Sequence, residues 1–226
     1  LDYAFGGAGV LEDEDEDGFF TLKKEMDSYF LTHQDKADAD SLYVVWIGAN
    51  NYLAVPSDPD ESIHEVMQGI QHGLQRLAEK GAKHIMVISL PDLGRTPAAR
   101  EFDEVEVLSY FSKQHNDALE KNMGDLQAHY PNTQWIYFDI NYMLNEVMNS
   151  PERFGFNNIT DTCYEDAMAK TSPKSVLKMV STFQRGKANA CDGHLFFDPV
   201  HPSAPAHQIM ADRLITLFEE KGISFE

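Results

Sequence analysis

An aspartate and a histidine lie three residues apart near the end of the chain, in the run Asp198-Pro199-Val200-His201-Pro202. Proline fixes its own φ and disfavours a helix in the residue before it, so we expect a rigid turn here rather than a helix face. A carboxylate that holds an imidazole supplies a hydrolase with its general base, because the aspartate fixes the tautomer and the histidine moves protons. The short spacing also fits a plain turn in which Asp198 caps the backbone and His201 has no chemical role.

Two further places could contact a reacting group. Residues 42–47 (LYVVWI) form a short, continuous apolar run, which is typical of a strand buried on both faces. Asn50 follows this run, at the sheet edge where open α/β folds bind ligands, and its amide could donate to a developing oxyanion. It could equally close the strand with a local turn. Gly6-Gly7 permits a close backbone approach to a ligand, or simply a tight turn.

The residue types that bind metals are poorly spaced for that purpose. Cys191 and His194 resemble half of a zinc site, but no second pair of ligands has suitable spacing. The acidic run 12–17 lacks the spacing and the glycine of an EF-hand, so we interpret it as a solvated loop. No nucleotide-binding glycine motif is present. We therefore predict neither a metal nor a cofactor. Cys163 and Cys191 could form a disulfide or be two unrelated buried thiols.

Apolar periodicity gives the order of the elements. Strands are predicted at 42–47, 83–90 and 135–140, and helices at 19–31, 57–81, 101–130, 141–148 and 203–220. Ser203 is the predicted N-cap of the last helix, and Gly81 the predicted C-terminal cap of the second. Strands that alternate with helices at these lengths indicate an α/β fold with a parallel, doubly wound sheet.

The bulk properties limit the possible functions. A chain of 226 residues is long enough for one domain, 1–226, with a sizeable core. The formal net charge is −19, which argues against nucleic acid as a partner because phosphate binding needs lysine and arginine. No run of 18 or more apolar residues is present, so no membrane-spanning helix is predicted.

Four segments, in order along nearly the whole chain, resemble blocks of the GDSL, or SGNH, family of esterases and lipases. The segment 196–211 (FFDPVHPSAPAHQIMA) resembles the last block, 3–8 (YAFGGA) the second, 46–52 (WIGANNY) the third, and 90–94 (LPDLG) the family's L-P-P-L-G segment. The third block of the family usually reads G-x-N-D-Y. Asn51 replaces its aspartate, which supports the geometry of the block, and we expect this change to be tolerated.

The resemblance implies a fold and a set of roles. The fold is the three-layer α/β/α, flavodoxin-like SGNH-hydrolase fold with a mostly parallel sheet. His201 would be the general base and Asp198 its partner, while the Gly7 N–H and the Asn50 side chain would form the oxyanion hole. The family's first block, Gly-Asp-Ser-Leu, carries the nucleophilic serine and closes the first strand, and this chain has no such block. We therefore assign no catalytic serine and expect it on an upstream, N-terminal segment.

The segment 155–163 (GFNNITDTC) resembles a further family segment, G-F-x-N-x-T-x-x-C, near which many relatives form a disulfide. The resemblance favours a Cys163–Cys191 bond that closes the loop 163–191. The interior of this loop is basic and apolar, on an otherwise acidic chain. It could be a lid that meets anionic lipid surfaces, a loop that an activating protease cuts, or a covering loop packed on the core.

Taken together, the resemblance predicts a serine hydrolase for carboxylic esters of lipids, of the phospholipase A or lysophospholipase type. Acyl transfer to an alcohol or sterol would be a related activity. Such relatives are secreted or otherwise exported bacterial proteins that act at membrane surfaces. The alternatives are a carbohydrate esterase and a non-catalytic lipid- or glycan-binding pseudoenzyme on the same fold. Fold alone does not decide between these possibilities.

Overall fold

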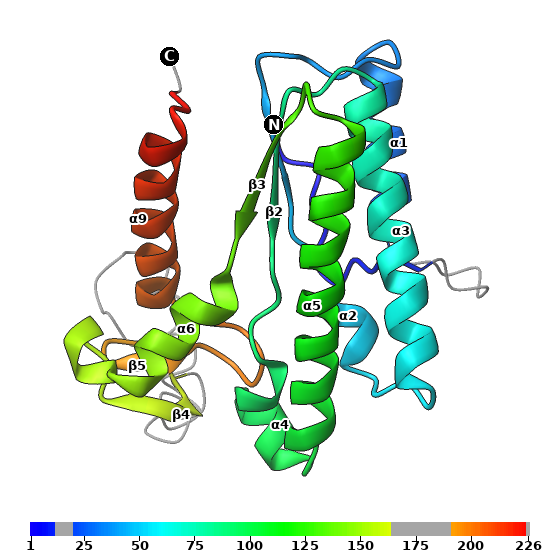
Figure 1. Ribbon diagram of the computed structural model, residues 1–226. Helices are drawn as coiled ribbons and strands as arrows, with labels where there is room; N and C mark the ends of the chain where they lie inside the picture. The colour runs from blue at the N-terminus through cyan, green and yellow to red at the C-terminus, as the bar shows by residue number, and fades with distance from the viewer. Residues whose placement is uncertain (12–19, 164–190, 225–226) are drawn as a thin grey trace, which may run out of the picture. The chain divides into compact units, whose positions relative to one another are not determined.

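The computed structural model describes residues 1–11, 20–163 and 191–224 (Figure 1). These residues belong to two compact units, and each unit is described by itself. The first unit contains Leu1–Gly94 and Val105–Asn141. The second contains Arg95–Glu104 and the described residues from Tyr142 onwards.

A three-stranded parallel sheet forms the centre of the first unit. Its order is β1 (Leu42–Val45), β2 (His84–Ile88) and β3 (Gln134–Phe138), with β2 paired on both sides. The side chains of β2 from Ile85 to Ile88 are all buried. Such a strand needs apolar side chains on both faces, which explains the continuous apolar run in the sequence. The predicted α/β class with a parallel sheet is confirmed.

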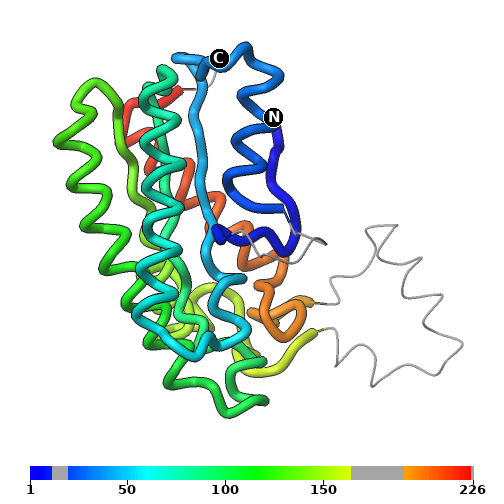
Figure 2. The backbone as a smooth tube through the Cα atoms, turned by 90° about the vertical axis from the view of Figure 1, so that its right-hand side faces the viewer, coloured from blue at the N-terminus to red at the C-terminus, as the bar shows by residue number. Residues whose placement is uncertain are grey.

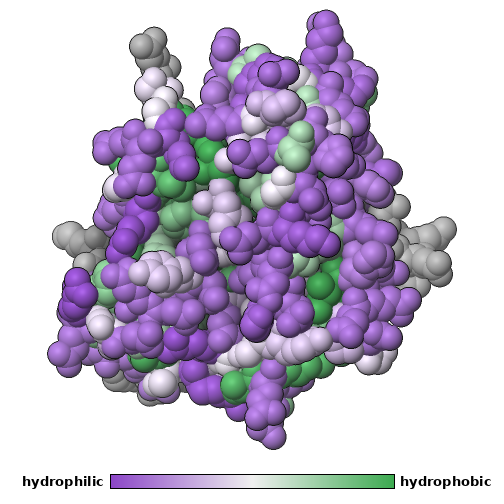
Figure 3. All heavy atoms as spheres, in the orientation of Figure 1, coloured by the Kyte–Doolittle hydropathy of each residue, from purple (hydrophilic) through white to green (hydrophobic). Residues whose placement is uncertain are grey.

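Four helices accompany this sheet: α1 (Leu22–Thr32), α2 (Ala49–Tyr52), α3 (Pro59–Glu79) and α5 (Val105–His129). Asp58 caps α3 by accepting from the Glu61 N–H, and Gly81, at φ +111°, follows its C-terminal end as predicted. The buried stripe of α3 consists of Ile63, Val66, Met67, Ile70, Leu74 and Leu77. The outward surfaces of α3 and α5 are largely hydrophilic (Figure 3).

The single helix predicted over 101–130 is wrong at its start. A short helix, α4 (Pro97–Glu101), comes first, with Thr96 as its N-cap. The backbone then turns at Asp103, which has φ +59°, and α5 begins only at Val105. The left-handed conformation of Asp103 ends the helical hydrogen-bond pattern, and aspartate is one of the few residues that tolerate it.

The second unit has a small sheet that the sequence did not predict. Strands β4 (Asn158–Thr162) and β5 (His194–Phe196) pair in parallel. Both are short, and β4 (NITDT) is largely polar, so neither has a readable hydrophobic period. Among the described residues after β3, the other elements are α6 (Ile140–Asn149), a 3₁₀ turn at Pro151–Phe154 and α9 (Ala204–Lys221). The apolar core of this unit consists of Val147, Phe156, Leu195, Phe196 and Ala206.

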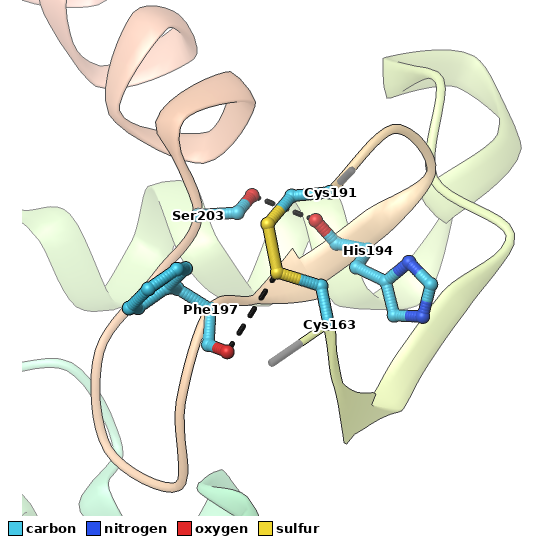
Figure 4. Close-up of a disulfide and its surroundings, with 5 residues drawn as sticks. All are labelled: Cys163, Cys191, His194, Phe197 and Ser203. Atoms are coloured by element: carbon cyan, nitrogen blue, oxygen red, sulfur yellow. Dashed lines mark hydrogen bonds between the residues drawn. A yellow bond between two sulfur atoms is a disulfide. The ribbon is translucent and has the colours of Figure 1, made fainter. Parts of the chain in front are cut away.

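A disulfide joins Cys163 to Cys191, with the two Cα atoms 5.1 Å apart (Figure 4). Cys163 directly follows β4 and is buried, while Cys191 accepts the backbone N–H of His194 at the start of β5. The predicted pairing is confirmed. The proposed lid within 163–191 lies outside the described residues. No helix among the described residues is long and apolar enough to cross a membrane.

We expect this disulfide to stabilise the second unit. Closing a loop with a sequence separation of 28 removes chain entropy from the unfolded state. Loss of the disulfide should therefore lower the free energy of unfolding by about 3–4 kcal/mol. Urea unfolding of the Cys163→Ser/Cys191→Ser variant should show this loss relative to the oxidised wild type. Reductant should destabilise the wild type and leave the variant unchanged. Equal stability of the two proteins without reductant would contradict the prediction.

Candidate active site

The carboxylate of Asp198 builds the turn that carries His201. Its Oδ1 accepts the backbone N–H of Val200 at 2.9 Å and that of His201 at 2.7 Å. The Phe197 N–H donates to the His201 carbonyl at 2.9 Å and closes the turn. The prediction of a turn rather than a helix face is confirmed. Asp198 therefore caps the backbone, which is the alternative role that the short spacing also fits. This role is compatible with a contact between Asp198 and the His201 ring.

The same carboxylate holds the imidazole of His201. The Nδ1 of His201 lies 2.8 Å from Oδ2 of Asp198, and the His201 side chain is 71% exposed. Burial raises the pKa of Asp198, but the hydrogen bonds from Val200 and His201 lower it by more than burial raises it. The pKa of Asp198 is therefore below its usual value. Asp198 therefore stays ionised at neutral pH. A carboxylate on Nδ1–H leaves Nε2 as the basic nitrogen, which is the arrangement of a general base.

Contacts within the second unit fix both ends of this turn. Ser203 donates its hydroxyl to the His194 carbonyl at 2.7 Å (Figure 4). Its backbone N–H donates to the Leu195 carbonyl at 2.8 Å. From α4, the Ala98 N–H donates to the Pro199 carbonyl at 2.9 Å. Ser203 does occupy the N-cap position of α9, but its side chain makes no capping bond. The predicted N-cap position is confirmed, and the Ser203 hydroxyl attaches α9 to β5 instead of capping the helix.

In the first unit, the two predicted oxyanion donors belong to segments that touch. Gly7 has φ +81° in a turn closed by the Ala8 N–H and the Phe5 carbonyl, a conformation that favours glycine. Asn50 lies in α2, directly after β1, and its Nδ2 donates to the Ala8 carbonyl at 2.8 Å. The N-terminal segment also runs beside α1, as Figure 2 shows, where Leu22 donates to the Gly9 carbonyl.

Asn51 makes a second connection between the same two segments. Its Oδ1 accepts the Val10 N–H at 2.9 Å, and its side chain packs against Gly9. An amide oxygen makes this bond as a carboxylate oxygen would. The geometry therefore gives a reason why asparagine can stand at the position where the third block usually has aspartate.

Two residues of α5, which the sequence analysis did not assign to the site, support it from the core. His115 is fully buried, and its Nδ1 lies 2.9 Å from the hydroxyl of Tyr52, which ends α2. Burial lowers the pKa of His115 to about 3, so the ring is neutral. The amide of Asn116 bonds both the N–H and the carbonyl of Leu90, each at 2.8 Å.

The sequence contains a signal that His115 is buried. The residue lies in phase with the apolar stripe of α5, four residues after Phe111 and four before Leu119. A histidine in such a stripe must be buried and needs a polar partner. The partner could not be identified, because Tyr52 is 63 residues away in the chain. Among the described residues, no group of three histidine, cysteine or acidic side chains could hold a metal ion.

Comparison with known proteins shows which family the chain belongs to. The family model described as GDSL-like lipase/acylhydrolase matches residues 2–214. The chain belongs to this family. Its α/β fold is accordingly that of the SGNH hydrolases, as the GDSL resemblance of the sequence predicts. The match includes the two segments of the predicted oxyanion hole and the Asp198–His201 turn.

Individual relatives of this GDSL chain are distant. It is 26% identical to a phosphatidylcholine-sterol acyltransferase of Aeromonas hydrophila, over 83% of the chain and 64% of that protein. It is 26% identical to a GDSL esterase/lipase of Arabidopsis thaliana, over 99% of the chain and 68% of that protein. The secreted effector protein SseJ of Salmonella typhimurium is 24% identical over 83% of the chain and 41% of its own length. The chain thus spans about two thirds or less of these relatives.

The neutral state of His115 should make the protein sensitive to acid. In the unfolded chain His115 takes up a proton near pH 6.5, but in the fold only near pH 3, so the unfolded state binds more protons between these values. Stability should fall by about 1.4 kcal/mol per pH unit from this residue as the pH drops below 6.5. The free energy of unfolding of the wild type minus that of His115→Asn should show this slope and be constant above pH 7.5. A difference between the two free energies of unfolding that does not change with pH would contradict the prediction.

Two substitutions should separate the backbone contacts of Asp198 from its contact with the His201 ring. Asn at this position keeps an oxygen for the N–H groups of Val200 and His201, whereas Ala removes it. We expect hydrogen exchange of these two amides to be about fivefold faster in Asp198→Ala and nearly unchanged in Asp198→Asn. Exchange rates measured by NMR test this. Equal rates in the wild type and Asp198→Ala would mean that the prolines alone hold the turn.

Proposed function

We propose that the protein is a serine hydrolase that cleaves carboxylic esters of lipids. The contact that carries this proposal is the 2.8 Å hydrogen bond between Asp198 and an exposed His201. A carboxylate bound to one ring nitrogen, with the other nitrogen able to meet a substrate, is what proton transfer in acyl chemistry requires. Family membership gives the class of bond, since the matching model describes lipases and acylhydrolases.

In the proposed reaction, His201 Nε2 removes the proton of a serine hydroxyl while the serine oxygen attacks the ester carbonyl. The Gly7 N–H and the Asn50 amide would stabilise the oxyanion of the tetrahedral intermediate. His201 then gives its proton to the departing alcohol, which leaves an acyl ester on the serine. Water takes the acyl group in hydrolysis, and an alcohol or sterol takes it in transfer. Asp198 keeps the imidazole oriented and stabilises its protonated form.

The nucleophile belongs to the family's Gly-Asp-Ser-Leu block, which is not among these 226 residues. We therefore place the serine outside them, on an N-terminal segment of the full protein. The substrate class is proposed to be phospholipid or lysophospholipid, at a membrane surface. The relative named phosphatidylcholine-sterol acyltransferase supports a lipid ester and makes acyl transfer a natural second activity.

An exported location and an activating protease belong to the same proposal. The Cys163–Cys191 disulfide supports export, because such bonds persist in oxidising compartments. The protease would act within 163–191, and comparing the activity of intact and cleaved protein tests that part directly.

A fluorophosphonate probe tests the proposal on the full-length protein. The probe should label one serine, and mass spectrometry should place the adduct outside these 226 residues. His201→Gln should abolish labelling, whereas His129→Gln, which alters an exposed histidine at the end of α5, should not. Asn50→Ala should lower kcat on lysophospholipid by about 100- to 1000-fold.

Each alternative has its own outcome in this experiment. An adduct within the 226 residues would overturn the placement of the nucleophile but not the chemistry. Absence of labelling, both before and after cleavage of the loop, would favour a lipid- or glycan-binding protein without catalysis. Activity on acetylated sugars with none on lipid esters would favour a carbohydrate esterase.

A further inference from the structure

The helix that carries Asn50 is a single turn, so its placement depends on what holds its ends. It spans Ala49–Tyr52, and Gly48 precedes it at φ +119°. Helices this short are not stable by themselves, because few hydrogen bonds oppose the loss of chain entropy. The direction of the Asn50 amide is therefore set by contacts that α2 makes with the rest of the first unit.

One buried imidazole contacts both ends of this turn. A Cβ atom on Gly48 would lie only 2.7 Å from Cε1 of His115, so the ring is packed directly against the backbone before Asn50. At the other end, the Tyr52 hydroxyl lies 2.9 Å from Nδ1 of the same ring. Tyr52 is itself fully buried and stacks on Phe111, with ring centroids 4.9 Å apart.

His115 is well suited to act as a fixed support. It lies in the middle of the 25-residue helix α5, and it is completely buried. The next residue, Asn116, is bonded to both backbone groups of Leu90, so α5 is attached at this level to the loop after β2 as well. Two adjacent side chains of one helix thus hold the loops that follow two neighbouring strands.

The support extends from α2 to the glycine turn. The Asn50 amide has two N–H groups, and the bond of Nδ2 to the Ala8 carbonyl uses one of them. This bond fixes the plane of the amide and so fixes the direction of the second N–H. Asn51 ties the same turn to Val10. A shift of α2 would therefore move the second N–H of Asn50 relative to Gly7.

We infer that His115 is a positioning residue for the reaction proposed above. Through its contacts with Tyr52 and the Gly48 backbone, it fixes the direction of the Asn50 amide. This inference rests on the proposed role of Asn50 as an oxyanion donor. His115 touches no substrate. Small displacements of a donor reduce transition-state stabilisation steeply and affect substrate binding little. The effect of disturbing His115 should therefore appear in kcat rather than in KM.

Tyr52→Phe tests this with the smallest possible change, because it removes one hydroxyl and keeps the stacked ring. In the full-length protein it should lower kcat about tenfold on a soluble ester, with KM within a factor of two. The matched control is Tyr43→Phe, which also loses a partly buried tyrosine hydrogen bond, 2.7 Å to the Tyr29 hydroxyl, in the same unit. The control should keep the wild-type kcat. His115→Asn should behave like Tyr52→Phe, and a kcat equal to that of the control in both variants would overturn the inference.

A second measurement is independent of catalysis. The side-chain amide signals of Asn50 in ¹⁵N-labelled protein, assigned by their loss in Asn50→Ala, should shift and exchange faster in Tyr52→Phe but not in Tyr43→Phe. Unchanged signals in Tyr52→Phe would overturn the inference, whether or not the protein is active. If the wild type hydrolyses no ester, the proposed function fails, and the amide signals still decide whether His115 positions Asn50. If His115→Asn does not fold, Tyr52→Phe decides alone.

Discussion

The central constraint on the first unit is that β2 is paired on both sides and covered on both faces. Its peptide groups are satisfied by β1 and β3, and its side chains from Ile85 to Ile88 are apolar and buried. Polar side chains therefore have no place along this buried part of β2, and several lie where the strands end. Asn50 and Asn51 follow β1, and the loop after β2 is held by Asn116. The proposed oxyanion donor Asn50 is thus located beyond the end of β1, where the sheet no longer requires apolar residues.

In the second unit, one carboxylate combines structure with chemistry. Asp198 uses one oxygen mainly for the backbone of the turn and the other for the imidazole of His201. The negative charge that holds the imidazole of His201 is therefore the same charge that shapes the turn around it. This dual use explains why a short D-x-x-H spacing is informative here, although it is common in sequences. Both interpretations of the motif, the backbone cap and the catalytic partner, describe the same atoms.

The sequence predicted what depends on long apolar periods and on local turn chemistry. The three strands of the main sheet, the helix α3 and its glycine cap, and the turn at Asp198 all have such signals. It did not predict β4, β5, α2 or α4, which are held mainly by contacts distant in sequence. The role of Asn51 depends on its contact with Val10, which is 41 residues away in the chain. The support from His115 was similarly hidden, because a period of 3.6 residues reveals burial but not the partner.

The disulfide has a consequence for how this protein can vary through evolution. It clamps the chain where β4 ends and shortly before β5 begins, so the two strands are joined by a bond as well as by the polypeptide between them. The spacing of the strands, and of the Asp198 turn that follows β5, is then set by the cystine. Insertions, deletions or changes of composition between the two cysteines need not disturb either. The bond thus separates changes in the stretch between the two cysteines from the geometry of the Asp198 turn.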